Sequence, residues 1–503
     1  MHAENRPESL LNTELLTAHP LIIAANRGPV EFARGDNGTF IHRRGSGGVV
    51  TAMRALGQYV DPIWVASAIT EADRAQAILA GGEPVIVDDE DGPRLRIHFA
   101  AVPHETYDLA YDNISNELLW FLQHYLWDAA HEPDIDAATW RAWDVGYQMT
   151  NLAFANTIVR AAESAHSAEP IVMLQDYHLY LTAASVRERI PGAILQQFIH
   201  IPWPDKDYWR LLPPRMRQEI CISLMANDVV GFQTYDHCHN FISTCVANIP
   251  EADGDQERMI LQYKGRTIRV RPYPISLDVP VVRRVAGGET VTHYRESLRE
   301  FFGERTILRV DRAEPSKNIL RGFRAFDLLL DRYPQWLGKV RFLALLVPSR
   351  LTVPRYQQYL DDIYVLMSRI NTKHGTEAWR PIRLLVGDNY ERALAVLSQY
   401  DVLLVNSLAD GMNLVAKEGA LLNERGGVLV LSETAGAHEQ LGPHALSIAP
   451  TDIVGTADAL HLALIMPEEE RHQRADALRQ SVEDEDIVRW ITDQLADLAD
   501  LSR

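Results

Sequence analysis

The chain has 503 residues, more than one compact core holds, since domains usually contain roughly 100 to 200 residues. Its 47% hydrophobic and 23% charged residues are typical of a globular protein, and it lacks the run of about 18 apolar residues that a membrane span needs. A formal charge of −19 argues against a nucleic acid partner, because no basic stripe offsets the repulsion of a phosphate backbone.

The N-terminal segment has no basic start followed by an apolar run, so we expect no secretory signal. Cys221, Cys238 and Cys245 have spacings that fit neither a CxxC metal pair nor a disulfide framework. We therefore expect a cytoplasmic protein with reduced thiols and no membrane partner. Its sequence leaves open whether it is a homo-oligomer.

Short apolar runs rich in β-branched residues alternate with amphipathic stretches along most of the chain. Near-continuous apolar strands separated by helices indicate parallel sheets covered on both faces. The expected strands lie at residues 21–27, 84–89, 95–102, 171–178, 194–202, 228–234, 306–312, 340–348, 382–388, 401–407 and 426–433. The sequence therefore predicts an α/β fold with two doubly wound, Rossmann-like domains.

The segment TIRVRPYPISLD at 267–278 interrupts this alternation with two prolines and marks the expected domain boundary. We expect one Rossmann-like domain over 1–270 and a second over 271–482. Residues 483–503 have helical apolar spacing and an acidic start, which suits a helix N-terminus. They are expected to form a terminal helix that packs back on the N-terminal domain.

Polar or charged residues follow nearly every expected parallel strand. In open parallel sheets, ligands bind beyond the carboxyl ends of the strands, so these positions are candidate site residues. They are Asn26, Arg27, Asp176, His200, Arg312, Arg350, Asp388, Asn389 and Asp410. The simplest architecture places the rims of the two sheets face to face across a cleft.

Arg312 and Lys317 lie in VDRAEPSKN, in a loop that leads into a helix expected from about Asn318. Backbone N–H groups and the positive end of that helix add to the charge of the two side chains. Two unit charges about 4 Å apart interact by about 4 kcal/mol at an effective dielectric of about 20, so this pair predicts a site for a diphosphate. A solvated basic loop is the alternative.

The segment ADGMNLVAKEG has carboxylates at both ends of a glycine turn and a helix start. Carboxylates accept hydrogen bonds from sugar or ribose hydroxyls, and N–H groups of the turn would face a ligand. The residues expected at this site are Asp410, Gly411, Met412, Asn413, Leu414 and Glu418. A helix cap beside a surface acid is the alternative.

Three weaker signals have ordinary structural explanations beside the functional ones. The glycines around Ser46 in RRGSGGVV allow close approach to a phosphate, but GSGG is also an ordinary loop. Asp253 and Asp255 form a DxD in a polar turn, and we expect no metal there. His200 and Asp176 could each be a satisfied core residue, although their shared rim favours a site.

In this order along the chain, the motifs resemble the trehalose-6-phosphate synthase family of retaining glycosyltransferases, which have the GT-B fold. The resemblance runs from about residue 20 to 445. The matching pieces are AANRGPV, GGVVTAM, YDNISNELLW, QDYHL, FIHIPWP, GFQT, YPISLD, RAEPSK, PSR and DGMNLVAKE.

The resemblance implies an acceptor, glucose 6-phosphate, whose phosphate is held by Arg27, the Gly48 backbone, Tyr111 and Arg350. It further implies that Trp120 and Asp176 contact the acceptor sugar.

The resemblance also implies a nucleotide-sugar donor. His200 would lie beside the 6-hydroxyl of the donor sugar, Asp410 at another hydroxyl and Glu418 at the ribose, while Arg312 and Lys317 would hold the diphosphate. Such enzymes use no metal, no cofactor and no covalent nucleophile. The residues expected to carry catalysis are Arg312, Lys317, Asp176 and His200.

The sequence departs from the family at two places. WVAS has Ser67 where the family often has a second tryptophan, and RAEPSKN replaces the commoner RLDYSKG. Other segments are similar to an actinobacterial branch that includes a GDP-dependent pseudo-glycosyltransferase, which lacks the tyrosine found here at Tyr111.

We therefore expect trehalose 6-phosphate synthesis. GDP-glucose is favoured over UDP-glucose, because Asp388 or Asn389 could accept the N–H groups of guanine. The alternatives are a pseudo-glycosyltransferase that couples a GDP-linked cyclitol to an aminocyclitol phosphate, and a catalytically silent module that binds sugar phosphates.

Overall fold

The computed structural model describes residues 13–35, 37–45, 61–88 and 94–501. Its contacts divide the chain into two compact units. Unit 1 contains Met1–Pro274 and Val488–Arg503, and unit 2 contains Ile275–Ile487. The chain therefore passes between the units twice. Across the described ranges, every helix is too short or too polar to cross a membrane.

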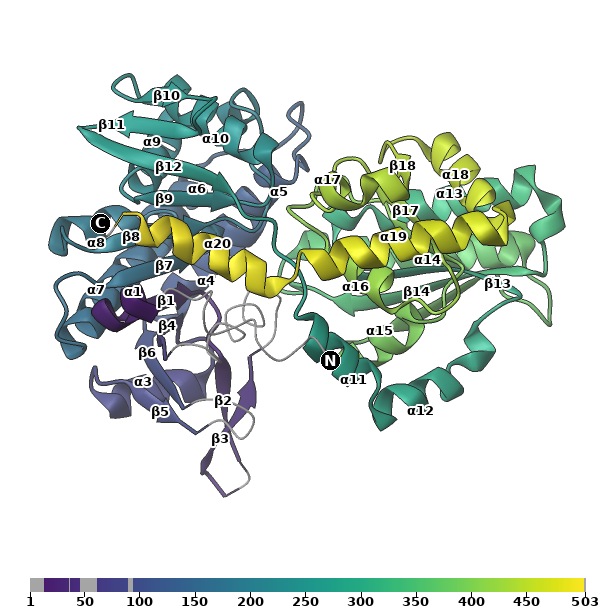
Figure 1. The fold of residues 1–503 in the computed structure, drawn as a ribbon, viewed down its shortest axis with the longest axis horizontal. Helices are drawn as coiled ribbons and strands as arrows, with labels where there is room; N and C mark the ends of the chain where they lie inside the picture. Colours follow the sequence, from purple (N-terminus) through teal and green to yellow (C-terminus); the bar gives the residue numbers. More distant parts are fainter. Residues whose placement is uncertain (1–12, 36, 46–60, 89–93, 502–503) are drawn as a thin grey trace. The chain divides into compact units, whose positions relative to one another are not determined.

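Unit 1 is built around a large mixed sheet (Figure 1). Its strands are β1 (Leu21–Ala25), β2 (Val30–Arg34), β3 (Phe40–Arg44), β4 (Ile63–Ser67), β5 (Val85–Val87), β6 (Leu95–Ala100), β7 (Ile171–Gln175), β8 (Ile194–Phe198), β9 (Val229–Phe232), β10 (Asp253–Asp255), β11 (Ile260–Tyr263) and β12 (Arg266–Pro272). The sheet order is β10-β11-β12-β9-β8-β7-β1-β4-β6-β5, and β2 pairs with β3 separately.

The strands of this sheet from β12 to β6 are parallel, whereas β5, β10 and β11 pair antiparallel. From β1 the chain adds β4 and β6 on one side, and β7, β8 and β9 then extend the sheet on the other. The topological switch point of unit 1 is therefore between β1 and β7, where the ligand site of a doubly wound sheet is expected.

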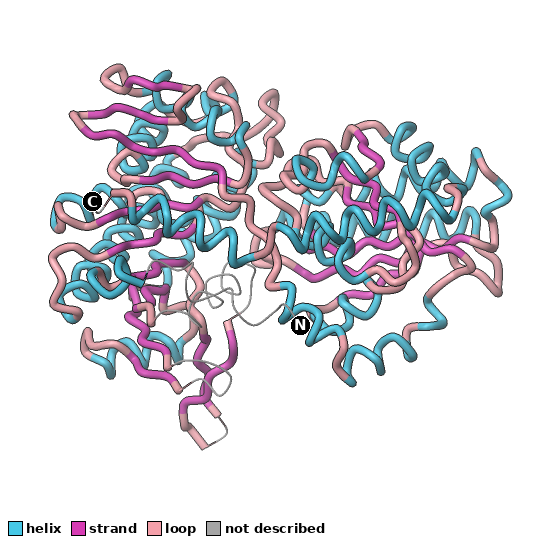
Figure 2. Tube along the Cα trace, viewed as in Figure 1, coloured by secondary structure: helices cyan, strands magenta, loops and turns pink. Residues whose placement is uncertain are grey.

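Helices lie along the sheet of unit 1 (Figure 2). They are α1 (Thr13–Ala18), α3 (Glu71–Ala80), α4 (His104–Asp108), α5 (Trp120–Gln123), α6 (Ala137–Arg141), α7 (Gln148–Ser164), α8 (Thr182–Arg189), α9 (Pro214–Leu224), α10 (Tyr235–Asn248) and α20 (Ile487–Ala499). Two π-helical segments, η1 (Leu109–Leu119) and η2 (Ala142–Tyr147), and two 3-10 turns, η3 (Tyr177–Leu179) and η4 (Tyr208–Leu211), complete this unit.

Unit 2 contains one parallel sheet. Its strands are β13 (Arg305–Ala313), β14 (Val340–Pro348), β15 (Ile382–Val386), β16 (Val402–Val405), β17 (Val428–Ser432) and β18 (Leu446–Ile448). Their order, β15-β14-β13-β16-β17-β18, has the Rossmann pattern 3-2-1-4-5-6. The switch point of unit 2 is therefore between β13 and β16.

The helices of unit 2 flank this sheet. They are α11 (Val279–Ala286), α12 (Glu289–Ser297), α13 (Ile319–Arg332), α14 (Pro354–His374), α15 (Tyr390–Leu397), α16 (Leu414–Leu422), α17 (His438–Leu441), α18 (Ile453–Ile465) and α19 (Glu468–Asp484), with the 3-10 turns η5 (Arg299–Phe301), η6 (Pro315–Lys317), η7 (Pro334–Trp336) and η8 (Gly442–His444).

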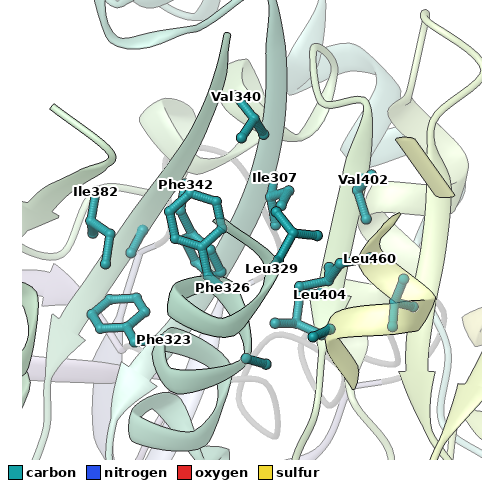
Figure 3. Packing of buried hydrophobic residues seen from close by; sticks show 14 of the residues in the cluster. Ile307, Phe323, Phe326, Leu329, Val340, Phe342, Ile382, Val402, Leu404 and Leu460 are labelled. Atoms are coloured by element: carbon teal, nitrogen blue, oxygen red, sulfur yellow. The ribbon is translucent and has the colours of Figure 1, made fainter. Parts of the chain in front are cut away.

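A core of aromatic and branched residues joins α13 to the sheet (Figure 3). Phe323 and Phe326 are three residues apart on α13, so both face the strands, and each packs edge-on against Phe342 of β14 at centroid distances of 5.2 and 5.3 Å. This packing fixes the start of α13, which follows the loop that carries Lys317.

The predicted fold class is confirmed: each expected strand segment contains a strand, and both sheets are of the doubly wound type. Strand β4 was missed, because the run IWVAS is short and ends in residues of low strand propensity. The other strands that were not expected are β2, β3, β10, β11, β12 and β18, and β12 overlaps the segment at 267–278 that was expected to interrupt the alternation. The acidic start expected for the terminal helix is wrong, since Glu483 and Asp484 end α19 and α20 begins at Ile487.

Candidate active site

The loops that follow β13 and β16 meet at the switch point of unit 2. The ammonium of Lys317, at the end of η6, forms an ion pair with Oδ2 of Asp410. The same carboxylate oxygen accepts hydrogen bonds from Oγ of Ser407 at 3.2 Å and Nδ2 of Asn413 at 3.0 Å. The structure thus brings together two predicted site residues that lie 93 positions apart in sequence.

The charge on Lys317 is maintained by its surroundings. Burial alone would lower the pKa of this lysine, but the carboxylates of Asp410, Asp311 and Glu314 outweigh that effect and raise it. With 12% of its side chain exposed, Lys317 is a partly buried lysine whose raised pKa keeps it charged at neutral pH.

Arg312 and Arg350 share one carboxylate. Glu314 is fully buried and places Oε1 3.0 Å from a guanidinium nitrogen of Arg312 and Oε2 2.9 Å from one of Arg350. Arg350 also donates to the hydroxyl of Tyr356 at 3.2 Å. Both predicted arginines therefore belong to one cationic cluster with Lys317 in unit 2.

Buried polar side chains next to this cluster hold its backbone in place. The fully buried Arg309 donates to Asp311 at 2.8 Å, to the backbone carbonyl of Lys317 at 2.8 Å and to Oδ1 of Asn406 at 2.6 Å. Asn318, whose φ of 57° lies in the left-handed region, donates through its side chain to the carbonyl of Asn406 at 2.9 Å. These bonds fix the backbone on which Lys317 stands.

The turn before α16 presents the predicted segment Gly411–Leu414. Asn413 has a φ of 116° and caps the helix, because its Oδ1 accepts the N–H of Ala416 at 2.9 Å. The carbonyl of Met412 accepts the N–H of Ala437 at 3.0 Å, which ties the turn to the loop after β17. Leu414 is the first residue of α16, where helix N–H groups favour an anion.

Glu418 lies one turn into α16 and accepts a hydrogen bond from the Tyr390 hydroxyl at 3.1 Å. Burial raises the pKa of Glu418 to about 7, and the Tyr390 hydrogen bond opposes that rise. Tyr390 follows Asn389, whose Oδ1 already accepts the N–H of Arg392 at 2.7 Å as the cap of α15. Asp388 is exposed beside it.

In unit 1, the strand ends at the switch point carry a stack of aromatic side chains. Arg27 follows β1 and forms a hydrogen bond with Tyr111 of the π-helical segment η1. The Tyr111 ring stacks on Tyr107 at 5.4 Å and on His178 at 5.8 Å. Turns of π-helix are frequent at functional sites, and here η1 sets Tyr111 beside the guanidinium.

Trp120 belongs to the same aromatic group. It is 4% exposed and stacks on His124 at 4.0 Å, and its ring centroid is 5.7 Å from that of Tyr177. Tyr177 directly follows Asp176 in the chain, so Trp120 and Asp176 are neighbours at this end of the sheet.

A hydrogen bond joins the side chain of Asp176 to the backbone of His200. Asp176 has φ 68° and ψ 178°, a conformation that is costly for any residue except glycine. Its Oδ1 accepts the N–H of His200 at 3.2 Å, and its carbonyl accepts Nε2 of Gln197 at 2.9 Å. Burial lowers the pKa of His200 to about 3, so its imidazole is neutral, and Nε2 lies 3.0 Å from Oε1 of Gln175.

The structure therefore gathers the predicted residues into two groups. Unit 2 holds Arg312, Lys317, Arg350, Asp388, Asn389, Asp410, Gly411, Met412, Asn413, Leu414 and Glu418, and unit 1 holds Arg27, Tyr111, Trp120, Asp176 and His200. Gly48 and Ser46 lie outside the described residues. Ser67 is buried and donates to Oδ1 of Asn26 at 2.9 Å.

Sequence reasoning missed the residues that hold the predicted ones in place. Glu314 and Arg309 are two such residues, and Gln175 is a third. Glu314 stands between the two predicted cations in RAEPSK, so its position was a signal, whereas the alternation of strand residues gives no sign that Arg309 is buried.

One group of described side chains has the geometry to hold a metal ion, namely Asp327, Asp331 and His374. Lys373 already contacts both carboxylates, at 2.9 and 2.5 Å. Because its ammonium occupies the position of a cation between them, these residues form a satisfied ion-pair group on α13 and α14.

Two Rossmann-like units, one with a cationic cluster at its switch point, are an arrangement that suits an anionic ligand at that point. The profile of glycosyltransferase family 20 matches residues 19–500, so the chain belongs to this family and the protein is a glycosyltransferase.

Its relatives include the UDP-forming alpha,alpha-trehalose-phosphate synthase of Schizosaccharomyces pombe, 32% identical over 91% of this chain and 86% of the relative. The validamine 7-phosphate valienyltransferase of Streptomyces hygroscopicus subsp. jinggangensis is 28% identical over 96% of this chain and 95% of the relative. A UDP-forming trehalose-phosphate synthase of Burkholderia xenovorans, solved with glucose-6-phosphate, is 27% identical with a TM-score of 0.79, covering 95% of this chain and 100% of that chain.

Proposed function

We propose that the protein transfers glucose from a nucleotide donor to glucose 6-phosphate with retention of configuration, giving trehalose 6-phosphate and a nucleoside diphosphate. The observation that carries this proposal is the cluster of Arg312, Lys317 and Arg350 with Glu314 and Asp410 at the switch point of unit 2. Family membership adds to it, because the relatives include trehalose-phosphate synthases.

On the donor side, Arg312 and Lys317 would bind the diphosphate. The ion pair with Asp410 orients the ammonium of Lys317. Charge that develops on the leaving diphosphate would then be met by cations that need no reorganisation, which is the most effective form of electrostatic catalysis. Asp410 and Glu418 would accept hydroxyl hydrogen bonds from the donor sugar and the ribose.

The chemical step would take place on one face of the donor sugar. The bond from C1 to the phosphate oxygen breaks, and a bond from C1 to the acceptor hydroxyl oxygen forms on the same face. The hydroxyl proton passes to an oxygen of the leaving phosphate, so charge and atoms balance without a covalent enzyme intermediate. In this proposal Arg312 and Lys317 supply the positive charge, and no step requires a metal.

On the acceptor side, Arg27 and Tyr111 would contact the phosphate of glucose 6-phosphate together with Arg350 and Gly48. Trp120 and Asp176 would contact its sugar ring. His200 is neutral at physiological pH because of its lowered pKa, so its ring can donate or accept one hydrogen bond to the donor sugar.

The donor base is the finer part of the proposal. GDP-glucose is favoured because guanine presents two N–H donors, and the exposed carboxylate of Asp388 could accept both. The side-chain oxygen of Asn389 accepts one hydrogen bond as a helix cap and has a second lone pair, so Asp388 or Asn389 carries this expectation. The named synthases are UDP-forming, which makes UDP-glucose the direct competitor.

The second candidate function is the pseudo-glycosyl coupling of a GDP-linked cyclitol to an aminocyclitol phosphate. A valienyltransferase is among the relatives, covering 96% of this chain. The stacked Tyr111 beside Arg27 favours glucose 6-phosphate as acceptor. A catalytically silent sugar-phosphate module is disfavoured, because every cation and carboxylate expected at the donor is present.

A donor and acceptor panel with product identification tests these proposals. GDP-glucose and UDP-glucose are compared at equal concentration with glucose 6-phosphate, and a GDP-linked cyclitol is offered with an aminocyclitol phosphate. We expect trehalose 6-phosphate, with faster turnover from GDP-glucose. Faster turnover from UDP-glucose would refute the donor preference, and a product only from the cyclitol pair would replace the main function by the second.

A further inference from the structure

Glu314 is a buried carboxylate to which the expected roles give no function. Its side chain is 0% exposed. Glu314 directly precedes η6 and lies in the sequence between Arg312 and Lys317, the two residues expected at the diphosphate. Each of its oxygens pairs with a different arginine, Oε1 with Arg312 and Oε2 with Arg350. Under the proposed function these arginines serve different substrates, the donor diphosphate and the acceptor phosphate.

We propose that Glu314 is a positioning residue that sets the spacing of Arg312 and Arg350, and through them the spacing of the two phosphate groups. This inference rests on the proposed function. A planar carboxylate whose two oxygens each form an ion pair is a rigid spacer. Each charge-assisted hydrogen bond restricts the direction of the guanidinium that it contacts.

The chemistry of the carboxylate makes this role testable. Both of its oxygens accept hydrogen bonds, whereas a glutamine amide has one accepting oxygen and an NH2 group that donates. In Glu314→Gln, one arginine would face a donor instead of an acceptor and would have to leave its position. An aspartate keeps both accepting oxygens on a side chain shorter by one carbon.

The surroundings indicate which arginine would be released. Arg350 is 10% exposed, and it also donates to Tyr356 and lies over that ring at 5.4 Å. Arg312 is 44% exposed and can turn toward solvent. We therefore expect the amide oxygen to stay with Arg350, and the donor diphosphate site to be the one that is impaired.

The sequence gives this position an independent interest. The family's commoner motif RLDYSKG has aspartate where RAEPSKN has Glu314, so the longer side chain distinguishes this protein. Glu314→Asp therefore serves as the conservative variant.

The experiment measures the binding of UDP or GDP and of glucose 6-phosphate, each alone, by titration calorimetry. For Glu314→Gln we expect the Kd of the nucleoside diphosphate to rise about tenfold or more and that of glucose 6-phosphate to change by less than about threefold. Glu314→Asp should keep both values within about threefold of wild type. Ser316→Ala, which removes the hydrogen bond of an uncharged hydroxyl to Oε1 at 3.1 Å and leaves both ion pairs, is the matched control.

Opposite results would overturn the inference. If Glu314 merely offset positive charge, the glutamine variant would bind both anions more tightly than wild type. If the residue were only structural, the thermal midpoint would fall while both Kd values stayed unchanged. If the wild-type protein bound neither ligand, the proposed function itself would fail; if it bound both and Glu314→Gln did the same, only the spacer role would be lost.

Discussion

At the scale of single residues, the ion pair of Lys317 and Asp410 has two consequences. It keeps Lys317 charged although only 12% of its side chain is exposed. It also means that each charge is stabilised by the other. Removing one member of a partly buried pair exposes the remaining charge to an unfavourable environment. Measurements on either residue must therefore separate stability from catalysis.

Lys317→Ala should lower kcat by about 100-fold or more with a smaller change in KM, because its charge is needed most as the diphosphate leaves. Steady-state kinetics with the better donor gives both constants. Lys317→Arg keeps the charge and is expected to retain more activity than alanine.

The matched control for this variant is Lys339→Ala, at an exposed lysine of the same unit. The thermal midpoint is recorded for all variants, since Asp410 loses its cation. An unchanged kcat in a folded Lys317→Ala protein would remove this residue from the mechanism.

Strand-end reasoning located residues whose position depends on the sheet alone. Asp410 and Asp176 each follow a parallel strand, and Arg312 is the second-last residue of β13 rather than a loop residue, so their shared edges could be predicted. The partners with which these residues form ion pairs could not be predicted. Glu314, for example, contacts two arginines because of the conformation of the loops that carry them. Arg350 has a left-handed φ of 47°, and the sequence does not signal this conformation because the residue is not a glycine.

At the scale of elements, the start of α13 fits closely over the buried arginine beneath the site. A Cβ built on Gly322 would meet Nη1 of Arg309 at 2.7 Å and Cδ2 of Leu404 at 3.2 Å. Close packing therefore favours glycine here, although glycine costs about 1 kcal/mol relative to alanine inside a helix. The benefit is room for the side chain that holds the carbonyl of Lys317.

Gly322→Ala should destabilise unit 2 by about 1 to 2 kcal/mol, since overpacking typically costs about 1 to 3 kcal/mol and exceeds the gain in helix propensity. Displacement of Arg309 should also raise KM for the nucleotide sugar. Chemical denaturation and steady-state kinetics measure the two effects.

Gly287→Ala is the control for this substitution, because the nearest atom to its added Cβ is 3.4 Å away and its backbone has an ordinary conformation. It should leave both stability and KM near wild type. A Gly322→Ala protein that is more stable than wild type would show that Arg309 has space to move.

Sequence patterns predicted strands better than helix ends. Runs such as VRFLALLVP at β14 are apolar on both faces, which is distinctive of a buried parallel strand. The π-helical turns of η1 and the break between α19 and α20 depend on tertiary packing, and neither has a local signal such as proline. Tyr111 could therefore be named, but not the helix type that orients it.

At the scale of the whole molecule, unit 1 is completed by the end of the chain. Helix α20 lies over the strands of this unit (Figure 1). Gln494 accepts a buried hydrogen bond from Gln196 at 2.8 Å, and Nε1 of Trp490 donates to the carbonyl of Tyr273 at 3.1 Å. The Trp490 ring also packs edge-on against Phe198 at 5.3 Å, close to His200.

Trp490→Ala should destabilise unit 1 by about 3 to 5 kcal/mol and leave unit 2 folded, because truncating a buried tryptophan leaves a cavity. Hydrogen exchange resolved by peptide reports each unit separately. Trp379→Ala, at a buried tryptophan of the unit 2 core, is the reciprocal control. Equal loss of protection in both units from Trp490→Ala would contradict this assignment.

The passage of the chain out of unit 1 and back has a consequence for its biosynthesis. Unit 2 is one continuous segment, so all its strands have left the ribosome before Val488 does. Until then β8 of unit 1 lacks the cover of α20, and the apolar surface around Phe198 is open to water or to chaperones. Unit 1 is therefore the first unit whose synthesis begins and the last whose synthesis is completed.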